Sequence, residues 1–337
     1  MWENYIPKTT KKHLTNVYTY VILGSEAKGD PNMTLIEIAQ MTIPQARKYL
    51  ESIRWPNGPV CPHCGGVRQW KIRTKSARPG VYKCRECRKQ YSVTVGTVMH
   101  SSKLSLRKWI MAFHLMCSSK KGVSALQLQR NLGLRSYKTA WHLSHRIRLA
   151  MKDFPVHMPP LQGTVEVDET YIGGRMRNQG RGLKLSNKTA VLALVERKGR
   201  AYAKPVKRVD AKALKGTILG MVDENSTIMT DEWSAYHGIG GFFDGGHGVV
   251  CHSDGEYVRG VVSTNQVESF FALLKRGVHG IFHHVSKEHL FRYCDEFSFR
   301  WSYRKVDDTE RTRQAIKGAD RKRLMYERMV NSDIERS

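Results

Sequence analysis

Three acidic residues occupy positions where predicted strands and a helix would bring their side chains together. Asp168 lies in the alternating segment Thr164–Ile172, which predicts a β-strand, and Asp231 follows another predicted strand over residues 227–230. Glu268 lies in a helix predicted to begin after Ser263. Carboxylates suit hard cations such as magnesium or manganese. A pair of these ions activates a water or 3′-hydroxyl and stabilises the leaving oxygen of a phosphodiester, so the acids indicate a phosphoryl-transfer site.

The third ligand of this site has two candidates on one helix. Asn265 precedes Glu268 by one turn, so both side chains point roughly the same way. We favour Glu268 because a carboxylate binds magnesium better than an amide, and Asn265 is the alternative. Lys275 lies two turns after Glu268 on the same face, where its ammonium would reach a phosphate, and we expect Arg276 beside it to contact DNA. Competing acids are Glu166, Glu169, Glu232 and Asp254.

Four cysteines near the N-terminal end predict a second metal site. Cys61 and Cys64 form one pair, Cys84 and Cys87 form another, and nineteen residues separate the pairs. Four thiolates at this spacing close tetrahedrally on one zinc ion, because each C-x2-C turn directs both sulfurs inward. Alternating apolar residues between 82 and 95 favour the short strands of a zinc ribbon. The other three cysteines are scattered, so a disulfide framework is the weaker interpretation.

The charge of the chain is concentrated around these cysteines. The formal net charge is +26, and residues 61–150 hold nineteen Lys and Arg but a single acidic residue, Glu86. A basic surface normally includes interspersed acids, so this imbalance favours nucleic acid as the partner. A membrane partner is disfavoured, since the longest apolar run, residues 17–24, is far shorter than the roughly 18 residues that a span needs.

A helical segment after the cysteines has the pattern of a helix-turn-helix. Ser124 and Ser136 are suitable N-caps for two helices, and Gly133 suits the turn between them. In the second helix Ala140, Leu143, Ile147 and Ala150 form one apolar stripe. We expect the other face to contact DNA, through Tyr137 and four cationic or titratable residues: Lys138, His142, Arg146 and Arg148. A plain packing role for the helix pair is the alternative.

The order of predicted elements after residue 160 indicates an α/β domain with an RNase H-like mixed sheet. Three strands, a helix over residues 211–222, a fourth strand and a further helix follow one another. In that topology the strands of Asp168 and Asp231 are neighbours at the middle of the sheet. The expected domains are an N-terminal extension (1–33), a helical lead-in (34–58), the zinc ribbon (59–100), the helix-turn-helix region (101–153), the catalytic domain (161–305) and a charged C-terminal tail (306–337).

Several of these motifs together resemble a known family. They are VEVDETYIGG around Asp168, TDEWSAY around Asp231, HSDGEY from His252 and TNQVESFFALLKRG from Thr264, preceded by the zinc ribbon. The chain from about Ile36 to Tyr303 is similar to the bacterial and archaeal insertion-sequence transposases called ISXO-two-like. Residues 1–33 match no motif, and one hypothesis is that translation begins near Met33.

The resemblance implies a recombinase with an RNase H fold and a DDE set of metal ligands. Such an enzyme nicks DNA at terminal inverted repeats and joins the freed 3′-hydroxyls to target DNA, using magnesium or manganese. Asp168 and Asp231 match the first two ligands by position, and this family often has asparagine in the third. We expect a homo-oligomer on paired DNA ends, acting in the cytoplasm at the nucleoid. The competing hypotheses are an inactive, domesticated DNA-binding protein and an RNase H-like nuclease.

Overall fold

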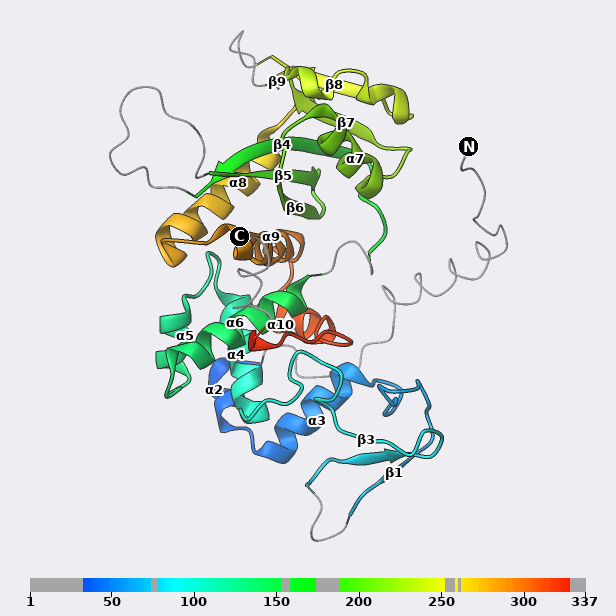
Figure 1. The fold of residues 1–337 in the computed structure, drawn as a ribbon, viewed down its shortest axis with the longest axis vertical. Coiled ribbons are helices and arrows are strands. Elements are labelled where there is room, and N and C mark those ends of the chain that lie inside the picture. Colours follow the sequence, from blue (N-terminus) through cyan, green and yellow to red (C-terminus); the bar gives the residue numbers. More distant parts are fainter. Residues whose placement is uncertain are drawn as a thin grey trace.

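A computed structural model describes residues 33–73, 78–152, 158–173, 188–251, 258–259 and 262–327. The mixed sheet lies at one end of the molecule and the cysteine-rich strands lie at the other, with a layer of helices between them (Figure 1). The N-terminal extension, residues 1–32, is outside the described residues. No helix of the described chain is long and apolar enough to cross a bilayer.

The cysteine-rich region forms a small antiparallel sheet, as the alternation predicts. Its strands are β1 (Gln69–Lys71), β2 (Tyr82–Cys84) and β3 (Gln90–Tyr91), in that order. Trp55 packs edge-on against Tyr82 and Tyr91, with ring centroids 5.9 and 5.8 Å apart. This aromatic cluster joins the small sheet to the helix that precedes it.

Five helices of the N-terminal half surround one apolar core. N-cap residues explain where most of these helices begin. They are α2 (Leu35–Gln40), α3 (Ile43–Arg54), α4 (Leu106–Ser118), α5 (Ala125–Asn131) and α6 (Tyr137–Met151). Thr34 and Thr42 form capping boxes, and Ser124 accepts from the Gln127 N–H at 3.1 Å. Ser136 occupies the N-cap of α6 without a side-chain hydrogen bond. Gly133 takes the predicted turn with a φ of 56°.

The C-terminal part of the chain returns to this helical core. Helix α10 (Asp308–Lys317) begins at Asp307, whose side chain accepts from the Glu310 N–H at 2.8 Å. Ala315, Ile316 and Ala319 are buried in the same cluster as α3, α4 and α6. Part of the charged C-terminal segment is therefore packed into the helical layer.

The larger sheet has five strands in the order β6-β5-β4-β7-β8. The strands are β4 (Thr164–Ile172), β5 (Thr189–Glu196), β6 (Ala201–Val206), β7 (Thr227–Asp231) and β8 (His247–Val250). β4, β5 and β6 pair antiparallel, whereas β7 lies parallel to both β4 and β8. The predicted order of strands and helices is therefore observed as far as β7, whereas β8 is a strand that was not predicted, and β4 is the central strand. A separate pair, β9 (Val258–Arg259) and β10 (Val262–Ser263), follows β8.

Helices cover both faces of this sheet, because successive strand residues point to opposite sides. Helix α7 (Ala211–Met221) covers the face that includes Val165 and Val167. Helices α8 (Asn265–Gly277) and α9 (Lys287–Ser302) cover the face that includes Val191 and Ala193, and a short π-helix, η4 (Val278–Phe282), connects them. Short 3₁₀ turns, η1 (Ser234–Tyr236) and η2 (Ile239–Phe242), follow β7. The result is a three-layer α/β domain.

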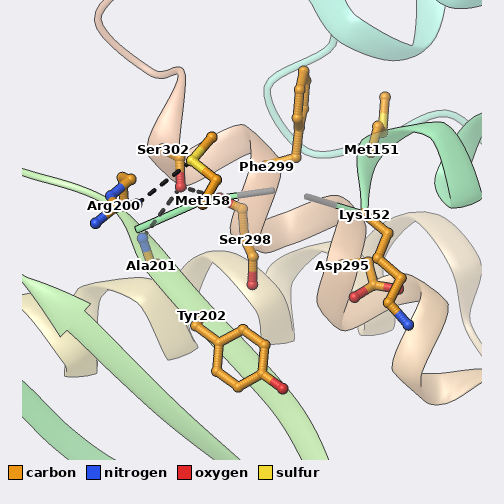
Figure 2. A pocket seen from close by; sticks show the side chains of 10 residues that line it. All are labelled: Met151, Lys152, Met158, Arg200, Ala201, Tyr202, Asp295, Ser298, Phe299 and Ser302. Atoms are coloured by element: carbon orange, nitrogen blue, oxygen red, sulfur yellow. Dashed lines mark hydrogen bonds between the residues drawn. The ribbon is translucent and has the colours of Figure 1, made fainter. Parts of the chain in front are cut away.

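A compact junction fixes the sheet against the helical layer. Arg200 donates to the carbonyl oxygens of Pro159 and Pro160 at 3.0 and 2.8 Å, which holds the linker that precedes β4. Figure 2 shows Ser302 of α9 beside β6, where its Oγ accepts from the Ala201 N–H at 3.2 Å. The cavity among these residues measures about 20 Å³, space for a single water and no larger ligand.

Candidate active site and metal centres

The register of two parallel strands brings the first two predicted acids together. Glu166 on β4 stands opposite Met229 on β7, the last pair of this ladder, and continuing the register by two residues would bring Asp168 opposite Asp231. Side chains two residues apart on a strand share a face, so both acids point to the side of the sheet that α8 covers. The expected meeting of these strands at the middle of the sheet is thus observed.

Asp168 is half-buried among other carboxylates, and Glu268 is one of those whose charge acts on it. Burial is the main cause that raises the pKa of Asp168 to about 7. The charges of Glu169, Asp231 and Glu268 contribute to this rise, and a hydrogen bond from the Glu169 N–H opposes it. That hydrogen bond measures 2.7 Å to Asp168 Oδ1. Asp231 accepts one from the Trp233 N–H at 3.2 Å. A carboxyl group with so high a pKa is typical of a functional site.

Helix α8 contributes the remaining predicted residues. Glu268 lies in its first turn and accepts from the Thr264 hydroxyl at 3.1 Å. Asn265 is the first residue of the helix and is exposed. Lys275 and Arg276 are exposed in its last turn. The helix therefore carries an acidic end beside Asp168 and a cationic end two turns away.

Glu166 has a role that the sequence analysis did not assign. It is only 1% exposed, and Arg197 donates to its Oε1 at 2.8 Å. Its Oε2 accepts from the backbone N–H groups of Gln266 and Val267 at 2.7 and 3.2 Å. A carboxylate at this place satisfies the free N–H groups of a helix start and complements the helix dipole. Glu166 therefore positions α8; its place two residues before Asp168, on the same face, was the available signal.

The other competing acids are engaged elsewhere or not described. Glu169 points to the opposite face of β4, where the Tyr236 hydroxyl donates to it at 2.6 Å. Burial is the main cause that raises the pKa of Glu169. Glu232 is half-buried after Asp231. Asp254 lies outside the described residues.

The donor chemistry of the three acids fits magnesium or manganese. All three offer carboxylate oxygens, the ligands that these hard ions prefer. Within the described part of the chain, only the four cysteine sulfurs form a group of ligand atoms that all lie within 4.8 Å of one another. The oxygens of the three acids are therefore more widely spaced than those sulfurs. Repulsion among carboxylates opposes closer approach and is reduced by a bound cation. Asp168, Asp231 and Glu268 are the residues that would hold it.

The four cysteines form a compact tetrad, as predicted. Cys61 Sγ lies 3.6 Å from Cys87 Sγ, and Cys64 Sγ lies 3.6 Å from Cys84 Sγ. Four sulfurs at about 2.3 Å from a tetrahedral zinc ion would be separated by about 3.8 Å, so the tetrad has the right size. The backbone N–H of Cys87, followed by that of Glu86, lowers the pKa of the Cys84 thiol to about 7.

The predicted exposed face of α6 is only partly correct. The apolar stripe of Ala140, Leu143, Ile147 and Ala150 is buried as predicted. Lys138 is exposed, and His142 is half-buried and lies 3.3 Å from the Leu324 carbonyl oxygen. Arg146 and Arg148 are 7% and 2% exposed, so their predicted place on an open face is wrong.

Arg148 is buried because α6 also packs against α9. Its Nε lies 2.6 Å from Glu296, and Arg300 lies 2.5 Å from the same carboxylate. The guanidinium of Arg148 also stacks over Tyr293 at 4.1 Å. Glu296 is fully buried, and its two arginines hold its pKa below the ordinary value despite that burial. Arg148 thus joins two helices in this conformation and is not available to DNA.

Comparison with known proteins relates both parts of the chain to transposases. A family model described as an ISXO2-like transposase domain matches residues 160–302, and one described as a transposase zinc-ribbon domain matches residues 44–90. A protein of Halobacterium salinarum, described as an uncharacterized protein in transposable element ISH50, is 30% identical over 274 residues, which are 76% of this chain and 90% of that protein.

The chain is therefore a transposase-type protein of an insertion sequence, built from a zinc ribbon and a mixed α/β domain. It belongs to the ISXO2-like transposase family. That family suggests an RNase H-like fold for the mixed sheet, in agreement with the strand order described above.

Proposed function

We propose that this protein is a DDE transposase that binds the terminal inverted repeats of an insertion sequence, cleaves DNA there and joins the freed 3′-hydroxyls to target DNA. The observation that carries the proposal is the alignment of Asp168 with Asp231, with Glu268 near enough to raise the pKa of Asp168. Family membership supports the same reaction class. The enzyme would act as a homo-oligomer on paired ends in the nucleoid.

In the proposed reaction the protein holds and orients charged groups. Magnesium or manganese, when bound, would activate the attacking oxygen and stabilise the leaving one. Asp168 has to lose its proton to serve as a ligand, so its raised pKa links activity to pH near 7. The backbone N–H groups of Glu169 and Trp233 orient the carboxylates of Asp168 and Asp231. Lys275 and Arg276 are the cations of α8 proposed to contact phosphates.

Glu268 is the proposed third ligand. Its charge contributes to the raised pKa of Asp168, which supports a position beside the first two acids. Asn265 lies one turn earlier and remains the alternative. Comparing Glu268→Gln with Asn265→Ala separates them, because removal of the true ligand abolishes cleavage and removal of its neighbour only weakens it.

For DNA recognition we propose that α5 and α6 act as a helix-turn-helix, with the zinc ribbon as a second contact. Tyr137 and Lys138 are exposed in the first turn of α6, the part of a recognition helix that reaches base edges. The turn at Gly133 and the contact between α5 and α6 support this proposal.

The test is incubation of wild-type and Asp231→Asn protein with labelled DNA that carries the sequences flanking the gene, with magnesium or manganese. We expect discrete nicks followed by joined products from the wild-type protein and none from Asp231→Asn. Asp244→Asn, which removes an exposed carboxylate of the same domain, is the matched control and should remain active. Cleavage without joining would identify a nuclease, and binding without cleavage would identify an inactive DNA-binding protein.

A further inference from the structure

Two adjoining hollows lie between the zinc ribbon and α6. One, of about 490 Å³, is bounded by α3, the end of the ribbon and the segment that leads into α4. The other, of about 600 Å³, is bounded by the same segment, by α6 and by Tyr326. Ser101, Ser102 and Leu104 line both, so the two hollows border the same segment. We refer to the two together as the ribbon–α6 groove.

The walls of the ribbon–α6 groove are cationic and rich in hydroxyl groups. Among the described residues that line it there is no carboxylate. Its basic side chains are Arg47, Arg78, His100, Lys103, Lys138, His142 and Arg146. Hydroxyl groups such as those of Ser92, Thr94 and Ser105 add donors that suit phosphate and sugar oxygens. These cations and hydroxyl groups are complementary to a polyanion.

Arg146 is the unusual cation in this groove. It is 7% exposed, yet no carboxylate pairs with it in the described chain, and its Nε has no hydrogen-bond partner there. One terminal nitrogen donates to the His100 carbonyl oxygen at 2.6 Å, and the guanidinium lies 5.1 Å from the ring centroid of Trp109. A desolvated guanidinium without an anion is costly, and a phosphate entering the groove would supply the missing acceptor.

The remaining cations are positioned to extend this contact. Lys138, His142 and Arg146 are spaced by four residues, so they form one stripe along α6. On the other side of the groove, the Arg47 side chain of α3 packs against Gly80 of the ribbon. A Cβ at Gly80 would overlap this arginine side chain, and the φ of Gly80 is positive, at 82°. With Arg78 of the ribbon and Lys103 of the segment before α4, the groove presents cations from four separate parts of the chain.

We propose that the ribbon–α6 groove binds one sugar-phosphate strand of duplex DNA, with a phosphate held at Arg146 and its neighbours contacted by Arg47, Lys103 and Lys138. This inference rests on the proposed function, which requires DNA binding, and deepens it by locating the backbone contact. Such contacts set the register of the protein on DNA and do not by themselves read sequence.

The test measures binding of a fluorescent duplex by the full-length, zinc-loaded protein as a function of salt. Each lost phosphate contact lowers the slope of log affinity against log salt by about 0.9. A variant with Arg47→Gln, Lys103→Gln and Lys138→Gln is therefore expected to lower the slope by about 2.7 on every duplex sequence. The matched control carries Lys48→Gln, Lys212→Gln and Lys317→Gln, three exposed cations outside the groove, and should change the slope little.

A separate variant, Arg146→Lys, with its folding checked by circular dichroism, should also bind DNA more weakly than wild type. Lysine keeps the charge but loses the planar set of donors. Equal slopes for the groove and control variants would overturn the groove proposal. If wild-type protein shows the groove-dependent slope but never cleaves, the groove stands and the proposed function fails. If the groove variant cleaves and binds like wild type while Asp231→Asn is inactive, the groove alone is wrong.

Discussion

The Glu166 carboxylate accepts a hydrogen bond from the Gln266 N–H at 2.7 Å and so ties the central strand β4 to the first turn of α8. Asp168 lies two residues further along that strand, and Glu268 lies two residues further along that helix. One buried side chain thus fixes the two elements that carry the first and third proposed ligands. Arg197, which pairs with Glu166 at 2.8 Å, holds it in place.

Replacing Glu166 with glutamine should weaken metal use more than it weakens folding. The change leaves Arg197 without its carboxylate and weakens the attachment of β4 to α8. Loss of a residue that orients metal ligands typically lowers metal affinity or activity by about 10–100-fold. We expect the magnesium concentration for half-maximal cleavage to rise by this factor. Glu196→Gln is the control, because Glu196 also pairs with an arginine, Arg200, but has no hydrogen bond to α8. An equal magnesium dependence in the two variants would refute the positioning role.

Replacing Asp168 with asparagine should stabilise the magnesium-free protein at high pH. The pKa of Asp168 rises from an ordinary 3.8 to about 7 on folding, so the native state binds the extra proton between these values. Stability therefore falls as pH rises through this window, and the variant escapes that loss. We expect its Tm to exceed that of wild type at pH 8, by about 2–4 °C if the relief is near 1 kcal/mol, and to match it at pH 4. Thermal scans in chelator-free buffer measure this, and a Tm difference independent of pH would contradict it.

Replacing Glu296 with glutamine should cost about 3 kcal/mol of unfolding free energy, because two buried arginines then lack their counter-charge. Arg148 and Arg300 both contact this carboxylate, which is fully buried. Urea denaturation measures the change. Glu310→Gln is the control, since Glu310 pairs with Arg313 at 3.7 Å near the surface, where a pair contributes less than about 1 kcal/mol. Similar losses of unfolding free energy in both variants would show that the buried ion pairs stabilise the protein no more than the surface pair.

Replacing Cys84 with serine should remove zinc and unfold the ribbon. The four sulfurs form one tetrad, so losing one ligand weakens the whole site. We expect about one zinc per wild-type chain by elemental analysis, none in the variant, and a red-shifted tryptophan emission as Trp55 separates from Tyr82 and Tyr91. Cys251→Ser, outside the tetrad, should retain zinc. Zinc retained by Cys84→Ser would disprove the tetrad as the binding site.

Local patterns were sufficient to predict most of the sheet and both acids on it. Alternation over residues 164–172 and the order of elements placed Asp168 beside Asp231, because the pairing of neighbouring strands follows from topology. The cysteine spacing predicted the tetrad for the same reason: its geometry is set within two short turns.

Contacts between distant segments were not predictable from periodicity. Arg148 is buried against Glu296, which lies 148 residues away, and the hydrophobic periodicity of α6 does not indicate that partner. The few apolar residues of α10 were hidden in a charged sequence, although Ala315 and Ile316 complete the helical core. Glu166 was a plausible ligand until its hydrogen bonds to the start of α8 were visible.

The return of α10 to the N-terminal helices has a consequence for synthesis of the chain. The core formed by α3, α4 and α6 also contains Phe299, Ala315, Ile316 and Ala319, so it is incomplete until those residues have left the ribosome. The five-stranded sheet is translated entirely before that point. A nascent or prematurely terminated chain therefore lacks a finished helical layer, even when the strands of the sheet are complete.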